Sequence, residues 1–212
     1  MRFALINENS QAAKNSQIEH VMKKVLEPMG HVVDNYGMKG PEDASITYVQ
    51  AGLLTALLLN ARAADYVITG CGTGQGAMLA ANSFPGVLCG HIEDPLDAYT
   101  FSQINDGNAI AIPFAKGYGW GGDLNLEYIL EKLFCEGPGQ GYPRERVVPE
   151  KANKKILDQV REITHRDFRD ILLDLDPRFV KETLSLSSFQ DLFFAHAQDE
   201  ELKELVRKIL AS

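Results

Sequence analysis

Residues 65–76 read Asp65-Tyr66-Val67-Ile68-Thr69-Gly70-Cys71-Gly72-Thr73-Gly74-Gln75-Gly76, and a helical pattern continues from Gln75 to Ser83. An apolar run, a glycine-rich loop and a helix in this order are typical of one unit of a parallel sheet. The unbroken apolar residues Tyr66 to Ile68 indicate a strand that is covered on both faces. The stretch therefore predicts an α/β fold.

The same alternation extends outward from this stretch through the first 135 residues. Besides Asp65–Thr69, the β-type runs are Arg2–Asn7, His31–Tyr36, Gly86–Gly90 and Asn108–Pro113. Helical spacing marks Ser10–Met29, Thr47–Ala64, Asp94–Asn105 and Gly122–Phe134, with Ser10, Thr47 and Asp94 as expected N-caps. The pattern predicts a doubly wound, five-stranded parallel sheet with helices on both faces.

The last third of the chain has a different composition. Residues Cys135–Pro149 are dense in glycine and proline, which predicts a long irregular loop or a linker. Residues Glu150–Ser212 contain no glycine and carry apolar side chains at helical intervals, so we expect three or four amphipathic helices. We expect one domain over residues 1–148 and a C-terminal α-helical extension over residues 149–212.

Composition limits the class of protein. With 212 residues and 45% hydrophobic residues, the chain can bury a core, while its longest apolar stretch is about half of a membrane span. The N-terminus lacks the pattern of a secretory signal, and three cysteines without a CxxC pair fit reduced thiols better than disulfides or zinc. We expect a cytoplasmic protein without a membrane partner. The formal net charge of −8 disfavours a nucleic-acid partner.

The glycine loop is the predicted reaction centre. Glycine at every second position lets backbone N–H groups converge on one point, and the positive end of the following helix favours the thiolate of Cys71. A thiolate there could attack an acyl carbon, or remove a proton α to a carbonyl while the amides hold the enediolate oxygen. Acyl transfer normally needs a partner base, and no neighbour in sequence supplies one. The residues thus favour proton transfer.

Several alternatives remain open at this point. A lone cysteine is often a small buried hydrophobe, and Glu93 lies about 20 residues beyond the loop, as the acid of a dinucleotide fingerprint would. That fingerprint belongs to the first βα turn, whereas this loop follows the third strand. A non-catalytic sugar or nucleotide binding module and a thiol hydrolase remain as rivals. His91, beside Glu93, is a candidate proton shuttle or metal ligand as well as a surface residue.

Four motifs carry a resemblance to a known family. They are Cys71-Gly72-Thr73-Gly74-Gln75-Gly76, Ala80-Ala81-Asn82, Glu93-Asp94-Pro95 and Asn105-Asp106-Gly107-Asn108. Over residues 1–148 the chain resembles the ribose-5-phosphate isomerase B and galactose-6-phosphate isomerase family. The resemblance implies a Rossmann-like homodimer with active sites at the subunit interface. It also implies aldose–ketose isomerisation through a cis-enediolate, without cofactor or metal.

The resemblance also assigns residues. Cys71 corresponds to the catalytic base and Thr73 to a residue that positions the substrate. The implied substrate-binding residues are Asn7, Glu8, Asn9, Gly72, Gly74, Gln75, Gly76, Asn105, Arg144 and Arg146. In the family the arginines reach into the partner's site. An anionic sugar on an acidic protein needs such planar, bidentate donors.

Two departures from the family pattern point to the substrate. Family members carry Asp-His where this chain has Asn7-Glu8-Asn9, and a ring-opening histidine where it has Ile104. A 4-deoxy-5-keto uronate has no hydroxyl at C4 or C5 to close the usual ring, so it needs no such histidine. The residues 6–11 and 141–147 and the helical extension also resemble the family's 4-deoxy-L-threo-5-hexosulose-uronate ketol-isomerases, which act in glycosaminoglycan or pectin breakdown. We expect this substrate, with ribose 5-phosphate or galactose 6-phosphate as the alternatives.

Overall fold

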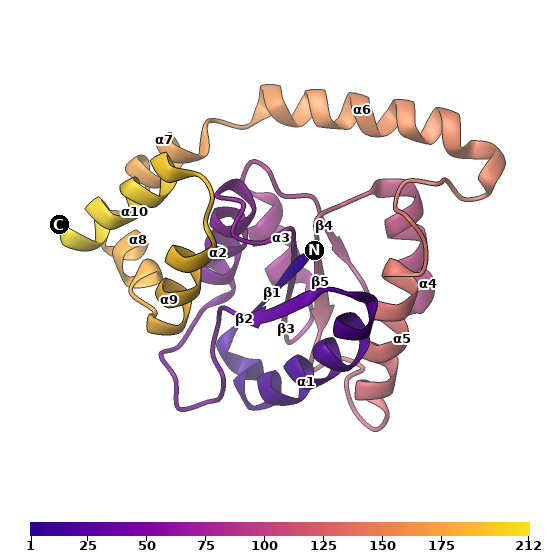
Figure 1. The fold of residues 1–212 in the computed structure, drawn as a ribbon, viewed down its shortest axis with the longest axis horizontal. Coiled ribbons are helices and arrows are strands. Elements are labelled where there is room, and N and C mark those ends of the chain that lie inside the picture. Colours follow the sequence, from indigo (N-terminus) through magenta and orange to yellow (C-terminus); the bar gives the residue numbers. More distant parts are fainter.

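A five-stranded parallel sheet forms the centre of the molecule in the computed structural model, which describes residues 1–212 (Figure 1). The strands are β1 (Arg2–Asn7), β2 (Val32–Asn35), β3 (Tyr66–Cys71), β4 (Cys89–His91) and β5 (Ala109–Pro113). They are ordered β2-β1-β3-β5-β4, and every neighbouring pair is parallel. The predicted doubly wound sheet is confirmed. The chain changes direction across the sheet between β1 and β3, which is where ligands bind in such folds.

Helices cover both faces of the sheet because the central strands are apolar on both faces. Alternate residues of β1 enter different cores: Ala4 and Ile6 join one, and Phe3 and Leu5 join the other. The first core is closed by α2 (Tyr48–Asn60) and α3 (Gln75–Asn82). The second core is closed by α1 (Asn15–Leu26), α4 (Pro95–Thr100) and α5 (Gly122–Phe134).

Two of the three expected helix caps are confirmed and one is wrong. Thr47 forms a reciprocal capping box with Gln50, and Asp94 accepts hydrogen bonds from the first two free N–H groups of α4. Ser10 does not cap a long helix. It lies in a 3-10 segment, η1 (Asn9–Lys14), which Glu8 caps, and α1 begins only at Asn15. The helix expected to end at Asn105 closes with a π-helical turn, η3 (Phe101–Asn105).

The C-terminal extension contains five helices, so the expected three or four was too few. They are α6 (Val147–Thr164), α7 (Phe168–Asp174), α8 (Pro177–Leu184), α9 (Ser187–His196) and α10 (Glu200–Ala211). Aspartate N-caps at Asp167, Asp176 and Asp199 divide the sequence into short helices. Regular structure also starts earlier than expected, because η4 (Arg144–Arg146) leads directly into α6. The predicted boundary at residue 148 therefore falls in the first turn of α6.

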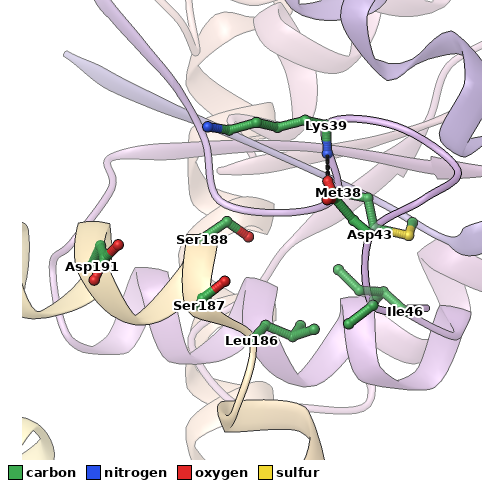
Figure 2. Close-up of a pocket in the computed structure, with 9 residues that line it drawn as sticks. Met38, Lys39, Asp43, Ile46, Leu186, Ser187, Ser188 and Asp191 are labelled. Atoms are coloured by element: carbon green, nitrogen blue, oxygen red, sulfur yellow. Dashed lines mark hydrogen bonds between the residues drawn. The ribbon is translucent and has the colours of Figure 1, made fainter.

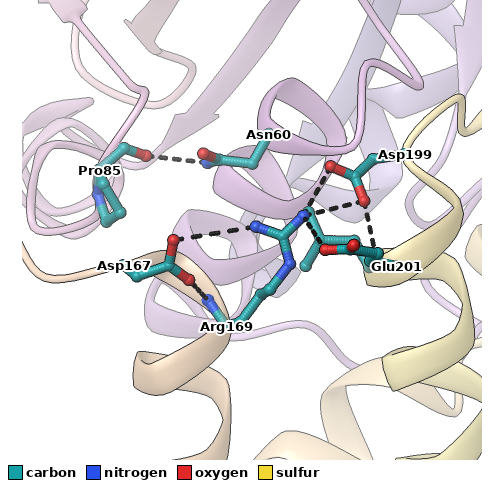
Figure 3. A network of polar contacts seen from close by, with 7 residues as sticks. Asn60, Pro85, Asp167, Arg169, Asp199 and Glu201 are labelled. Atoms are coloured by element: carbon teal, nitrogen blue, oxygen red, sulfur yellow. Dashed lines mark hydrogen bonds and ion pairs between the residues drawn. The ribbon is translucent and has the colours of Figure 1, made fainter.

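Helices α7 to α10 pack against α2 and share its core (Figure 1). Phe189 and Phe193 of α9 are fully buried there, with their rings stacked 5.3 Å apart. A polar network also links helices of the extension: Arg169 of α7 contacts Asp167, Asp199 and Glu201 (Figure 3). Hydrogen bonds from the Leu202 N–H and from Arg169 lower the pKa of Asp199. The extension is thus continuous with the core of the sheet.

Replacing Phe193 by alanine should lower the free energy of unfolding by about 3–5 kcal/mol, because the substitution leaves a cavity in this shared core. Urea unfolding followed by circular dichroism should show one cooperative transition, shifted as a whole. Leu173→Ala, at an exposed position of α7, is the matched control and should change stability by less than about 0.5 kcal/mol. Two separate transitions, with only the smaller one shifted, would contradict a shared core.

Candidate active site

Cys71 is the last residue of β3, and its backbone pairs with Pro113 at the end of β5. The side chain is buried except for 8% of its surface. Three residues later, Gly74 has a φ of +73° and starts α3 without any side-chain cap. The first N–H groups of α3 therefore have no partner from a capping side chain, and they form an anion-binding helix end next to the thiol.

Thr73 and Tyr48 lie around the thiol. The Thr73 hydroxyl is 4.0 Å from the Cys71 sulfur. A Cβ placed on Gly76 would lie 3.8 Å from the same sulfur and 3.4 Å from the ring of Tyr48. The space beside the sulfur is therefore bounded by the half-exposed Tyr48 ring and left open by the missing side chain of Gly76. Tyr48, the first residue of α2, therefore lies beside the glycine loop.

The other two thiols are in different environments. Burial raises the pKa of the Cys89 thiol to about 12, so this group stays protonated at neutral pH. Cys135 is exposed, and its thiol contacts the backbone of Lys132 at the end of α5. Of the three thiols, only that of Cys71 belongs to the glycine loop and lies beside the start of α3.

Asn7 and Glu8 lie beside the loop, at the end of β1. Asn7 pairs with Gly70 in the sheet, and the backbone N–H of Glu8 donates to the Gly70 carbonyl at 3.1 Å. The buried Asn7 side chain donates to Asn15 and leaves its carbonyl oxygen without a partner. Asn9 points elsewhere, since its side chain donates to the Ser45 hydroxyl at the surface. The structure thus brings two of these three residues to the thiol's end of the sheet.

A chain of polar side chains continues from Glu8 and was missed from the sequence. The Glu8 carboxylate accepts from the Ser10 N–H and hydroxyl, and Gln11 donates to the Ser10 oxygen at 2.8 Å. Lys14 in turn donates to Gln11 at 3.0 Å. The Gln11 amide nitrogen lies 3.9 Å from the Cβ position of Gly72, so it borders the loop. The spacing of Glu8, Gln11 and Lys14 at three-residue steps was the available signal, because a 3-10 turn aligns such residues.

Asn105, Arg144 and Arg146 do not meet Cys71 within the chain. Asn105 lies before the first residue of β5, whereas Cys71 pairs with Pro113, the last residue of that strand. The two ends of β5 are about 13 Å apart. The segment that carries the two arginines is fixed to η3, since the Gly141 N–H donates to the Gln103 carbonyl at 2.9 Å. Both arginines are exposed, and Arg144 is paired with Glu136. These three residues therefore lie at the opposite edge of the sheet from the thiol.

Two cavities are lined by other residues. One of about 230 Å³ lies between the Met38–Ile46 segment and the start of α9, lined by Lys39, Ser187 and Asp191 among others (Figure 2). Another of about 240 Å³, beside Asn105, is lined by Ile104 and three lysines of α6, namely Lys151, Lys154 and Lys155.

No cluster of three or more His, Cys, Asp or Glu side chains could hold a metal ion, and no helix has the length and apolarity to cross a bilayer.

Comparison with known families matches residues 5–129 to the model described as Ribose/Galactose Isomerase. The chain belongs to this family. A second model, described as Ribose-5-phosphate isomerase, matches residues 163–209, which lie within the helical extension. The comparison with curated protein sequences gives no match. The protein is a sugar isomerase, as the resemblance of its glycine loop implies.

Solved structures agree with the family over the whole chain. A 4-deoxy-L-threo-5-hexosulose-uronate ketol-isomerase complexed with a tartrate is 54% identical, covers 100% of both chains and has a TM-score of 0.98. A ribose-5-phosphate isomerase from Vibrio parahaemolyticus is 46% identical, covers 99% of both chains and has a TM-score of 0.96. A type B ribose 5-phosphate isomerase from Trypanosoma cruzi, 19% identical over 76% of this isomerase and 99% of that chain, shares the fold with a TM-score of 0.63.

Proposed function

We propose that the isomerase converts the aldose 4-deoxy-L-threo-5-hexosulose uronate into its ketose through a cis-enediolate, with Cys71 as the base and no cofactor. The observation that carries this proposal is the position of the Cys71 sulfur beside the uncapped start of α3. The thiolate would supply the base, and the free N–H groups would supply charge stabilisation for the oxygen that becomes negative.

The proposed reaction moves one proton between neighbouring carbons. The Cys71 thiolate removes the proton from C2, and the electron pair passes into the C1 carbonyl to give an enediolate. Backbone N–H groups of residues 72, 74, 75 and 76 hold the negative oxygen, while the Thr73 hydroxyl, 4.0 Å from the sulfur, positions the sugar. The thiol then returns its proton to C1, and the O2 proton passes to O1. Neither a redox cofactor nor a metal is needed to balance these steps.

The proposed substrate is inferred from the residues available to bind each end of the sugar. Ile104 cannot donate a proton, so a sugar that must first be ring-opened would find no acid at that position. A deoxy-keto uronate presents an open aldehyde at one end and a carboxylate at the other. Arg144 and Arg146 suit the carboxylate, because a guanidinium binds it bidentately. The 54% identical relative is complexed with a tartrate, which also carries carboxylates next to hydroxyl groups.

We also propose a homodimer in which each active site takes residues from both chains. Asn105, Arg144 and Arg146 lie at the edge of the sheet opposite to Cys71, so one chain alone holds only part of the site. An isologous dimer would place the Cys71 edge of each chain against the arginine edge of its partner, which forms two equivalent sites. Three free cysteines and this small metabolic substrate support a cytoplasmic location.

Helix α6 supports the dimer because its amphipathic pattern is inverted. Its polar residues Lys154, Asp158 and Arg161 line a cavity against the body, and Arg161 donates to the Val87 carbonyl. Its apolar side chains face away, with 75% of Val148 and 84% of Ile163 exposed, and no residue of α6 is buried. Such a stripe on the longest helix fits an interface with a second copy. Because α6 starts directly after Arg146, its docking would carry both arginines into the partner's site.

A substrate panel tests the proposed function. We expect kcat/KM for the deoxy-keto uronate to exceed that for ribose 5-phosphate, allose 6-phosphate and galactose 6-phosphate by at least about 100-fold. The assay should follow both ketose formation and loss of deuterium from C2, because a binding module would show neither. Ribose 5-phosphate is the second candidate, favoured by the 46% identical relative. Efficient turnover of a phosphate and none of the uronate would overturn the substrate assignment.

A further inference from the structure

A row of three polar side chains lies behind the glycine loop and is not used by the proposed chemistry. His91 ends β4, and its Nε2 atom is 2.8 Å from the carbonyl oxygen of Thr73. Its Nδ1 atom is 3.7 Å from a carboxylate oxygen of Glu93. Lys116, after β5, donates to the same Glu93 oxygen at 2.7 Å. The row therefore runs from the surface to the backbone of the catalytic loop.

The contact with Thr73 fixes the direction of one loop peptide. A carbonyl oxygen can only accept, so Nε2 carries the proton and donates it. In a trans peptide the C=O and the next N–H point in opposite directions, so the N–H of Gly74 must point away from His91. Holding the Thr73 carbonyl therefore aims the Gly74 N–H.

Glycine at position 74 and histidine at position 91 fit together. A Cβ on Gly74 would lie 2.7 Å from His91 Nε2, so the imidazole occupies the space that any other side chain would need. The φ of +73° at Gly74 is also a conformation that L-residues rarely adopt. The hydrogen bond from Lys116 lowers the pKa of Glu93, which keeps a carboxylate facing the imidazole Nδ1. The ring is thus held at Nε2 by the Thr73 carbonyl, and its Nδ1 side lies beside the Glu93 carboxylate.

We propose that His91, held by Glu93 and Lys116, is a positioning residue that keeps the Gly74 N–H aimed at the developing oxyanion. The proposal rests on the proposed function, because it assumes that the loop stabilises an enediolate. It differs from the earlier candidate roles of His91. The Nε2 proton is engaged by the Thr73 carbonyl, so it is not available for transfer to a sugar, and no metal-binding cluster includes this residue.

The test replaces the hydrogen bond and then restores it. His91→Leu removes the donor while keeping a side chain of similar bulk, and it should lower kcat by about 10–100-fold with KM nearly unchanged, because the oxyanion charge exists only in the transition state. His91→Gln places an amide N–H toward the same carbonyl and should recover kcat to within about threefold of wild type. His20→Leu, at an exposed position on α1, should leave kcat unchanged.

A second readout does not depend on turnover. In a Cys135→Ser background, the rate of Cys71 alkylation by iodoacetamide should be measured against pH, since the loop amides that hold an oxyanion also stabilise the thiolate. The profile should move to higher pH in His91→Leu and stay in place in His91→Gln. The proposal is overturned if the leucine variant keeps both its kcat and its profile, or if the glutamine variant loses as much as the leucine variant.

The two readouts separate failure of this inference from failure of the proposed function. If the wild-type protein isomerises none of the sugars in the panel, the proposed function fails, and the alkylation profiles alone decide the role of His91. If the wild-type protein is active and the leucine variant raises KM at unchanged kcat, His91 contributes to substrate binding and the positioning role is wrong. Unfolding curves of each variant identify any loss that comes from stability.

Discussion

Replacing Cys71 by alanine is expected to lower kcat by about 10³-fold or more, because it removes the proposed base and the polar side chains at the ends of β1 and β3 do not replace it. Asn7 and Thr73 have no basic atom at neutral pH, and the Glu8 carboxylate is engaged by the Ser10 N–H and hydroxyl. The substitution removes one sulfur atom, so the fold should stay intact. Steady-state kinetics and deuterium exchange at C2 of the uronate measure the effect.

The other thiols provide the controls for this experiment. Cys135→Ala changes an exposed thiol at the end of α5 and should leave kcat within about twofold of wild type. Cys89→Ala changes a buried thiol whose raised pKa keeps it protonated, so it should affect stability rather than exchange. A well-folded Cys71→Ala protein that still exchanges the C2 deuterium at more than about a tenth of the wild-type rate would rule out the thiolate as the base.

The fold was largely predictable from the sequence because its signals are local. Strand β3 is an apolar run between Asp65 and the glycine loop, and the caps at Thr47 and Asp94 depend on groups two or three residues away. Ser10 was misjudged because Glu8, two residues earlier, caps a 3-10 turn that delays α1 to Asn15. The start of α6 was missed because glycine and proline counts do not reveal the turn that begins at Arg144.

The candidate site was predictable only in part, because only some of its contacts join residues that are close in the sequence. Cys71 and Thr73 share one loop, so their meeting follows from sequence distance alone. The contact between His91 and Thr73 joins residues 18 apart, one at the end of β4 and one in the loop after β3, and sequence spacing carries no sign of it. The positions of Asn105 and Arg146 have a different cause. They lie away from the thiol because the length of β5 separates them from Cys71 within one chain. In the proposed dimer, the partner chain would bring its own copies of these residues to Cys71.

Mixing two inactive variants should restore activity if the site is shared between chains. Arg146→Ala should be almost inactive because the substrate carboxylate loses a bidentate partner, and Cys71→Ala lacks the base. After subunit exchange at equal concentrations about half of the dimers are mixed, and each has one intact site, so activity should recover to about a quarter of wild type. Steady-state assays before and after exchange measure this gain.

Whether the mixture regains activity depends on which chain supplies Arg146 to a given Cys71. If Arg146 served the thiol of its own chain, a mixed dimer would still lack either the arginine or the base in both of its sites, and the mixture would stay inactive. Differently tagged variants, recovered together by sequential affinity steps, establish that mixed dimers have formed. Ile156→Asp in both variants should prevent recovery, because a charge in the exposed apolar stripe of α6 would weaken the contact that brings Arg146 to the partner. An inactive mixture in which tagged dimers are present would contradict the donation of Arg146 to the partner's site.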